Sequence, residues 1–435
     1  MPRSTPPGSA LLVLALASAL GGCGSKNEST PSKGPAPRDA LHVEAPTKPL
    51  EAPTREQRAA FAKSTNAFGI DLMKAVGATP GNYVLSPASV SAALTMTFAG
   101  ARGETEAEMR RVLSLDGPVA DVAASAGRTL QALEDLPAPI TLRVANRLFG
   151  EQTITFEPAF LSLVKDTLGA PLVPVDFIGK PDAARLAIND WASFETDQRI
   201  NDLLPDDAVT PATRLMLANA IYFLADWASP FKASKTKSEP FTTGDKSRVD
   251  AHMMHQTESA RFVARDGFSA LSLGYEGGSL SMMLILPDAI DGLPAVEASL
   301  DSTKIDAIAR DQRFEEVIMA IPRFELTPPT IPLSEVLRKL GMVSAFDGAR
   351  ADFSGMSSST RLQIADVFHK AFIKVSEKGT EAAASTMVSA RLASASPMAA
   401  PPKLFIADHP FLFLIRDDAA GTILFAGRVD DPTHG

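Results

Sequence analysis

Residues 377–385 (EKGTEAAAS) place the tightest constraint on how this 435-residue chain can fold. A charged turn marked by Gly379 leads into small side chains that offer little for a hydrophobic core to pack against. Small residues of this kind make a poor core strand as they stand. The stretch makes sense as a segment that is exposed and must later slide into a crowded sheet. Composition alone favours the alternative of a flexible Ala/Ser linker.

Alternation in residues 380–391 argues against the linker. Successive side chains of a strand point to opposite faces. If the segment became a strand, one face would be small and uncharged, made of Thr380, Ala382, Ala384, Thr386, Val388 and Ala390. The opposite face would hold both charges and consist of Glu381, Ala383, Ser385, Met387, Ser389 and Arg391. A slip by one residue would bury both charges, so the pattern specifies the register.

The N-terminus has the features of an export signal. Arg3 supplies a thin positive region, and residues 11–20 form an apolar run too short to span a bilayer as a stable helix. The sequence LGGC at residues 20–23 is typical of a bacterial lipoprotein box, in which cleavage leaves Cys23 first and diacylated. We therefore expect a lipoprotein signal peptide over residues 1–22. An ordinary signal peptide with an incidental cysteine is the alternative.

The segment after this signal predicts a tether. Residues 23–55 are rich in Pro, Ser, Lys and Thr and have little to bury, which is typical of a disordered linker. With lipid on Cys23, it would hold a globular body of residues 56–435 off a membrane. We expect an extracytoplasmic protein anchored in the bacterial outer membrane or at the cell surface, facing the periplasm or the extracellular space.

Composition narrows what the body can do. The chain is 45% hydrophobic, which is ample for a large core, and its net charge of −9 without a basic stripe argues against nucleic-acid binding. Cys23 is the only cysteine, so the body has no disulfide, although an exported protein would reside in an oxidising compartment. Its stability must come from packing.

Local patterns in the body predict a mixture of helices and strands, and therefore an α+β fold. Helices are expected over 61–76, from a Ser86-Pro87 start to near Gly100, from a capping box at 105–108, and over 333–340 before Gly341. Strands are expected over 214–223 and 281–287, and as a hairpin of 411–415 and 422–429.

The residues give no support for an enzyme. His252 and His255 are three apart, but no Glu or Cys cluster completes a metal-ligand set, and a surface pair is the simpler interpretation. The chain has no nucleophile elbow, phosphate-binding loop or dinucleotide-binding glycine motif. We expect neither catalysis nor a metal or other cofactor.

A series of short motifs runs in order along residues 55–432. They include Ser86-Pro87, Ser89, Gly100-Ala101, Asn146, Trp191, residues 219–223 (NAIYF), Trp227, Pro230-Phe231, Pro322, Phe324, residues 351–355 (ADFSG), His369-Lys370-Ala371, Pro410-Phe411 and Gly427-Arg428-Val429. Each motif alone is weak, but the ordered set closely resembles the serpins, the family of serine protease inhibitors.

The resemblance implies a serpin fold, with a large central mixed sheet, further sheets, about nine helices and an exposed reactive loop. It also implies a suicide-substrate inhibitor: a serine protease cleaves the loop and forms an acyl-enzyme, and the loop then inserts into the central sheet as a new strand. The expected partner is an elastase- or subtilisin-like serine protease in a covalent complex, with a trypsin-like enzyme as the alternative. The inhibitor itself is expected to be a monomer.

The resemblance also assigns roles to two groups of residues. The hinge of the loop would comprise Glu377, Gly379, Thr380, Glu381, Ala382, Ala383, Ala384 and Ser385. The region where the sheet must open would contain Ser86, Ser89, Asn219, Trp227 and His369. Ordinary capping and core hydrogen bonding is the alternative role for the polar members of the second group.

The family's usual spacing from the hinge glutamate, counted from Glu377, places the scissile bond between Ala393 and Ser394. Arg391, Leu392 and Met398 are the alternatives for the residue before the bond. Arg391 would suit a trypsin-like enzyme but shortens the inserted strand by two residues, and Met398 would require about five extra residues before cleavage in a loop that is a few residues longer than usual. Small hinge residues favour an inhibitor over the rival interpretation, a non-inhibitory serpin that acts as a protease substrate or a binding protein.

Overall fold

The structure, a computed structural model, describes Leu41, residues 50–380 and residues 401–434. This part of the chain holds nine α-helices and two large β-sheets, so the predicted α+β class is confirmed. Several predicted functional positions lie outside the described residues, namely Cys23, Glu381, Ala382, Ala383, Ala384, Ser385, Arg391, Leu392, Ala393, Ser394 and Met398. None of the helices in the described ranges is long and apolar enough to cross a membrane.

The first helix, α2 (Arg55–Gly77), confirms the helix predicted over 61–76. Thr54 and Gln57 form a reciprocal capping box at its start, which satisfies backbone N–H groups that the first turn leaves unpaired. The predicted start at Ser86-Pro87 is also confirmed. Ser86 caps α3 (Pro87–Gly100) by accepting a hydrogen bond from the Ser89 N–H.

The capping box predicted at 105–108 is wrong, although a helix is present there. The N-cap of helix α4 (Gly103–Val112) is Arg102, three residues before Thr105, and Arg102 makes no side-chain cap hydrogen bond. Thr105 lies inside the helix and accepts a hydrogen bond from the Asp352 N–H at 3.0 Å. A partner distant in sequence therefore takes the hydroxyl that the local pattern assigned to a cap.

The remaining helices are α5 (Val119–Glu134), α6 (Pro158–Asp166), α7 (Pro181–Glu195), α8 (Leu293–Ser299), α9 (Ser302–Asp311) and α10 (Ser334–Lys339). The last of these confirms the short helix predicted over 333–340. Gly341 follows it with φ of +106°, a conformation that glycine adopts without strain.

A nine-stranded sheet contains the predicted hairpin and the strand predicted over 281–287. Its order is β1 (Tyr83–Leu85), β16 (Ile423–Val429), β15 (Phe411–Asp417), β8 (Leu280–Pro287), β7 (Phe268–Gly274), β6 (Arg248–Arg265), β9 (Arg313–Pro322) and β14 (Lys403–Ile406), with β5 (Lys237–Thr242) paired to β6. The last two strands of the chain are thus buried in the sheet between β1 and β8.

The seven-stranded sheet is mixed, with parallel and antiparallel pairs. Its order is β10 (Phe324–Leu326), β12 (Val367–Val375), β13 (Gly379–Thr380), β4 (Leu215–Asp226), β2 (Thr141–Glu151) and β3 (Val173–Val175), with β11 (Ile331–Pro332) paired to β12. Strand β4 confirms the strand predicted over 214–223. Its nearly unbroken apolar run reflects burial on both faces of the sheet.

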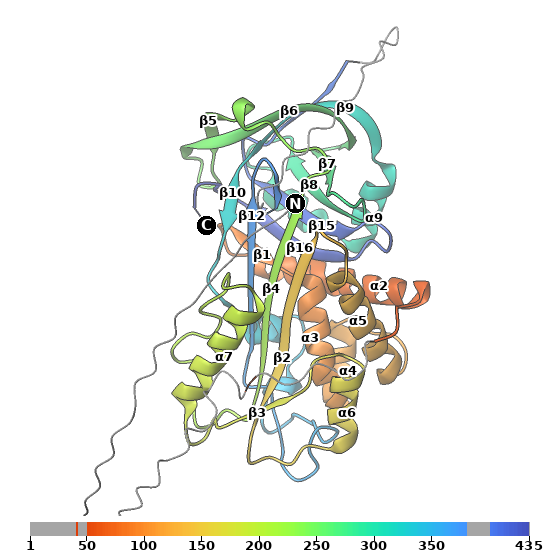
Figure 1. The fold of residues 1–435 in the computed structure, drawn as a ribbon, viewed down its shortest axis with the longest axis vertical. Helices are drawn as coiled ribbons and strands as arrows, with labels where there is room; N and C mark the ends of the chain where they lie inside the picture. Colours follow the sequence, from red (N-terminus) through yellow and green to blue (C-terminus); the bar gives the residue numbers. More distant parts are fainter. Residues whose placement is uncertain (1–40, 42–49, 381–400, 435) are drawn as a thin grey trace, which may run out of the picture. The chain divides into compact units, whose positions relative to one another are not determined.

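Helices cover both faces of the seven-stranded sheet (Figure 1). Ile188 and Trp191 of α7 share a hydrophobic cluster with Tyr222 of β4 on one face. On the other face, Leu94 of α3 belongs to the cluster that contains Leu217 of β4. Any strand that enters this sheet must therefore fit between two packed layers.

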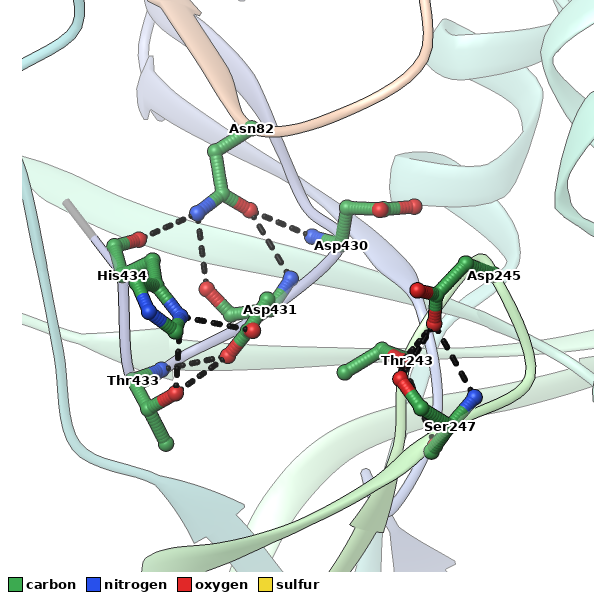
Figure 2. A network of polar contacts seen from close by, with 8 residues as sticks. All are labelled: Asn82, Thr243, Asp245, Ser247, Asp430, Asp431, Thr433 and His434. Atoms are coloured by element: carbon green, nitrogen blue, oxygen red, sulfur yellow. Dashed lines mark hydrogen bonds and ion pairs between the residues drawn. The ribbon is translucent and has the colours of Figure 1, made fainter.

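Asn82 fastens the C-terminal end of the chain (Figure 2). Its side-chain oxygen accepts the N–H groups of Asp430 at 2.7 Å and Asp431 at 3.0 Å, and its nitrogen donates to the Asp431 carbonyl at 2.7 Å. Asn82 directly precedes β1, so these bonds reinforce the pairing of β1 with β16.

Candidate functional site

Strands β4 and β12 pair directly along part of their length and are parted at one end. Residues 367–372 of β12 run parallel to residues 217–222 of β4. Beyond this stretch, β13 lies between them, with Thr380 paired to Val375 on one side and to Ala225 on the other. Both of these pairings are antiparallel, so the two residues of β13 separate β12 from β4 at this end.

A tight turn connects β12 to β13. The Ser376 N–H donates to the Gly379 carbonyl at 2.9 Å, and the Gly379 N–H donates back at 3.3 Å. A Cβ atom on Gly379 would lie 2.1 Å from the Ala225 carbonyl oxygen, so only glycine fits against β4 here. Glu377, Gly379 and Thr380 are buried, which corrects the expectation that the whole hinge is exposed.

Glu377 is held at this turn by a charged partner. Arg323 donates from Nε to both carboxylate oxygens at 2.7 Å, and Thr236 donates its hydroxyl at 2.5 Å. Burial opposes ionisation of Glu377, but these hydrogen bonds outweigh it, so the net effect is a lowered pKa. The carboxylate therefore stays charged at neutral pH and keeps the turn attached to Arg323.

Trp227 holds the same turn from the end of β4. Its backbone N–H donates to the Lys378 carbonyl at 2.7 Å, and its indole N–H donates to the Ser376 carbonyl at 2.9 Å. Its ring stacks on Tyr275 with centroids 4.7 Å apart, and the Tyr275 hydroxyl bonds to the Thr380 hydroxyl at 2.6 Å. Trp227 thus lies at the hinge turn, apart from the other four residues expected where the sheet opens.

Those four residues, Ser86, Ser89, Asn219 and His369, come together in one buried network. The Ser86 N–H donates to Nε2 of His369 at 3.1 Å, and Nδ1 of His369 bonds to the Asn219 side-chain oxygen. Asn219 donates to the Ser89 hydroxyl at 2.6 Å. His369 and Asn219 are direct neighbours in the parallel pairing, so the network lies across the closed part of the β4–β12 boundary.

The histidine in this network is neutral. Complete burial lowers the pKa of His369 to about 3, because a charged ring would lose its hydration. Since Nε2 accepts a hydrogen bond from Ser86, the single ring proton belongs on Nδ1, where it donates to Asn219. The two strands are thus joined here by neutral hydrogen bonds.

Several residues that shape the site had no role in the sequence-based expectations. Asn146 of β2 completes the network by donating to the Ser89 carbonyl at 3.1 Å, although its motif indicated only a strand residue. Arg323, Thr236 and Tyr275 hold the hinge. Arg323 lies between the motif residues Pro322 and Phe324, and this position was the one sequence signal that could have drawn attention to it.

The two histidines considered as possible metal ligands, His252 and His255, do not form a second site. His252 is exposed, and His255 bonds to Glu239 at 3.0 Å on the neighbouring strand β5. Within the described ranges, no group of three or more His, Cys, Asp or Glu side chains is arranged to hold a metal ion.

Comparison with known proteins identifies the family. The family model described as Serpin (serine protease inhibitor) matches residues 63–432. An uncharacterized serpin-like protein of Thermococcus kodakarensis is 38% identical over 432 residues, covering 98% of this chain and 99% of that protein. The leukocyte elastase inhibitor of Sus scrofa is 39% identical over 375 residues, covering 84% of this chain and 97% of the inhibitor.

A solved structure extends the likeness to three dimensions. An Arabidopsis serpin in its native stressed conformation matches with a TM-score of 0.75 and 30% identity, covering 88% of this chain and all of that one. The chain belongs to the serpin family and has the serpin fold. Relatives of this kind support protease inhibition in general as its function.

Proposed function

We propose that this serpin inhibits a serine protease by inserting its cleaved reactive loop between β12 and β4. The observation that carries the proposal is β13, which already lies between these strands and is antiparallel to both. Further insertion would replace one parallel boundary with two antiparallel ones, which adds main-chain hydrogen bonds to the sheet.

The observed pairing predicts where each inserted residue would lie. Continuing the antiparallel register from Thr380, which faces Val375 and Ala225, brings Thr386 opposite both His369 and Asn219. Residues 382, 384, 386, 388 and 390 would point to the same side as the buried Thr380. That side is the small, uncharged face that the sequence pattern predicts.

The length of β4 supports the proposed scissile bond. Ala390 would reach Leu215, the first residue of β4, in the same register. Cleavage after Ala393 would thus leave a strand long enough to fill the boundary, with a short connection to the protease. At ~3.3 Å per residue, insertion of residues 381–393 would carry the protease on the order of 40 Å.

Insertion would trap the protease as the acyl-enzyme ester that forms when the protease cleaves the loop. Its serine Oγ attacks the Ala393 carbonyl carbon, the bond to the Ser394 nitrogen breaks, and an ester joins the two proteins. If the displaced protease loses one donor of its oxyanion hole, deacylation slows by ~10²–10³. The ester then persists because water no longer hydrolyses it efficiently.

The residue before the bond favours a class of protease. Alanine fits the small primary pocket of an elastase-like or subtilisin-like enzyme, and the likeness to a leukocyte elastase inhibitor supports the first of these. Arg391 would instead present a trypsin-like site, and Leu392 or Met398 would suit other pockets. Cleavage at Arg391 would shorten the inserted strand by two residues.

We further propose that lipid on Cys23 anchors the protein outside the cytoplasm, with residues 23–55 as the tether and residues 56–435 as the inhibitory body. The motif at residues 20–23 supports this address. Replacing Cys23 with Ala should move the protein from the membrane fraction to the soluble fraction of bacterial cells. Retention in the membrane fraction would contradict the lipid anchor.

The inhibition proposal can be tested by incubating the purified body with pancreatic elastase and analysing denatured samples by gel and intact mass. We expect a covalent adduct and a released peptide that begins at Ser394. Subtilisin and trypsin serve as the comparison enzymes. Complete cleavage without an adduct by all three proteases would contradict inhibition and identify a protease substrate.

A further inference from the structure

A cavity of about 740 Å³ lies beside the hinge turn, and its volume is in the range of small-molecule sites. Its wall comes from the segment after β4, from β6 and β7, from two residues of β9 and from one residue of the turn after β15. The apolar part includes Trp227, Phe231, Leu273 and Met319.

The charged part of the wall is unbalanced. Arg261 pairs with Asp418 at 2.8 Å, so these two charges compensate each other. Glu258 has no cationic partner among the residues that the structure describes. The cavity therefore presents one uncompensated carboxylate, which favours a cationic ligand.

The hydrogen bonds around Glu258 leave one of its two carboxylate oxygens without a protein donor among the described residues. Ser229 at 2.6 Å and Gln256 at 2.9 Å both donate to one carboxylate oxygen, Oε2. For Oε1, the described part of the chain supplies no hydrogen-bond donor. A primary ammonium group brings three donors to such a place.

The wall is connected directly to the hinge. Trp227 donates to the Lys378 and Ser376 carbonyls, and the Phe231 N–H donates to the Glu377 carbonyl at 2.8 Å. Ser229 lies between these two residues and is the one that donates to Glu258. Residues 227–231 thus join the cavity to the turn that seats β13.

We propose that this cavity binds a small organic cation, a primary amine on an aromatic or aliphatic body. Binding stabilises the seated form of the hinge, in which β13 is paired with both β12 and β4. Glu258 takes the ammonium group, and the apolar wall takes the body. A ligand that binds the arrangement of residues 227–231 seen here shifts the hinge toward its seated form by its differential affinity. The regulatory consequence rests on the proposed function, since a seated β13 is the starting end of insertion.

Phenethylamine is a suitable probe, and calorimetric titration measures its binding without any protease. We expect a Kd on the order of 1 mM for so small a ligand. Glu258→Gln keeps the shape of the side chain and should weaken binding at least about tenfold, because it removes the charge. Glu316→Gln, an exposed acid on β9 that does not line the cavity, is the matched control and should leave the Kd unchanged.

Two further ligands separate charge from shape. 2-Phenylethanol has the same body without the positive charge, and 3-phenylpropionate reverses the charge; both should bind at least about tenfold more weakly. Equal binding of the alcohol, or unchanged binding to the Glu258→Gln variant, would overturn the cation site. No detectable binding of phenethylamine at 20 mM would overturn it as well.

Hydrogen exchange tests the link to the hinge. At ten times the Kd, the amides of residues 376–380 should exchange about tenfold more slowly in the wild type and unchanged in the Glu258→Gln variant. Binding without slower exchange would overturn the link. With a protease that the protein traps, the amine should also lower the number of inhibitor molecules consumed per trapped enzyme. If no protease is trapped, the proposed function fails, while the binding and exchange results still decide the cavity.

Discussion

The hinge turn and the buried polar network hold the same two strands by different chemistry. At the turn, β13 is seated by the charged pair of Glu377 and Arg323 and by the Trp227 ring stacked on Tyr275. In the network, His369 and Asn219 are joined by neutral hydrogen bonds across a direct β4–β12 contact. In the proposed insertion, the first set of contacts would remain in place, whereas the second would have to break.

This difference would allow the sheet to be stable and still to open in the proposed insertion. The turn is held by several contacts at once, namely the Glu377–Arg323 pair, the hydrogen bonds of Trp227 and the close approach of Gly379 to β4, so releasing it would break all of them. Neutral donors and acceptors can exchange partners, and the hydroxyl of Thr386 would arrive opposite His369 and Asn219 in the register set by β13. In this proposal the hinge turn stays fixed, and the hydrogen bonds across the middle of the β4–β12 boundary are replaced by bonds to the inserted strand.

The largest effect should come from a charge at the seat of β13. Thr380→Arg would place a guanidinium where Thr380 is buried against Ala225 and Tyr275, at a cost on the order of several kcal/mol. We expect loss of the covalent adduct and complete turnover of the inhibitor as a substrate, measured by gel with a protease that the wild type traps. Thr380→Ser is the control that keeps the hydroxyl. Inhibition as efficient as that of the wild type would contradict insertion from this end.

The next effect is the pH dependence of the free energy of unfolding that His369 of the buried polar network should produce. The pKa of His369 is about 3 in the folded state, below the ordinary value of 6.5, so the unfolded chain binds the extra proton between these values. Its contribution to stability is complete above pH 6.5 and is lost as the pH falls toward 3. The limiting slope is about 1.4 kcal/mol per pH unit. His369→Gln should remove this component.

The comparison must be between variants, because another buried group titrates in the opposite direction. Burial raises the pKa of Glu134 to about 7, so its contribution is lost as the pH rises from 4.5 through 7. Urea unfolding of the wild type and of His369→Gln between pH 4.5 and 7.5 isolates the histidine, with His252→Gln as the exposed control. Parallel curves for wild type and His369→Gln would show that His369 is not held neutral.

A smaller effect is expected from the turn itself. Gly379→Ala would bring a Cβ within 2.1 Å of the Ala225 carbonyl, and overpacking of this kind costs about 1–3 kcal/mol. We expect faster hydrogen exchange at residues 376–380 and a lower melting temperature. Gly274→Ala is the matched control, since its nearest neighbour would be the Ala228 Cβ at 3.9 Å. If both variants behave alike, the seat of β13 does not depend on close approach to β4.

The smallest effect should come from Arg323, whose side chain is 41% exposed and therefore partly screened by water. Arg323→Gln should reduce the free energy of unfolding by about 1 kcal/mol. Arg323→Lys should recover only part of the loss, because a lysine lacks the planar fork that contacts both carboxylate oxygens. Full recovery with lysine would show that charge alone holds the turn.

Sequence reasoning succeeded where local pattern and tertiary structure agree. The apolar run of β4 and the Ser-Pro start of α3 carry their own signals, and the predicted strand and cap are both present. It failed at Thr105, whose hydroxyl is taken by Asp352 from far along the chain. Arg323 is 54 residues from Glu377, and Tyr275 is 105 residues from Thr380, so no local pattern could connect either pair.

The central position of β15 and β16 determines whether the two pieces of the chain stay together after cleavage. A cut after Ala393 divides the chain in two, yet the smaller piece holds β14, β15 and β16, and two of these strands lie between β1 and β8. Asn82 adds bonds from the larger piece to the end of the smaller one. The cut protein would therefore remain a single particle under native conditions, heavier only by the one water that hydrolysis adds, and the two pieces would separate only after denaturation.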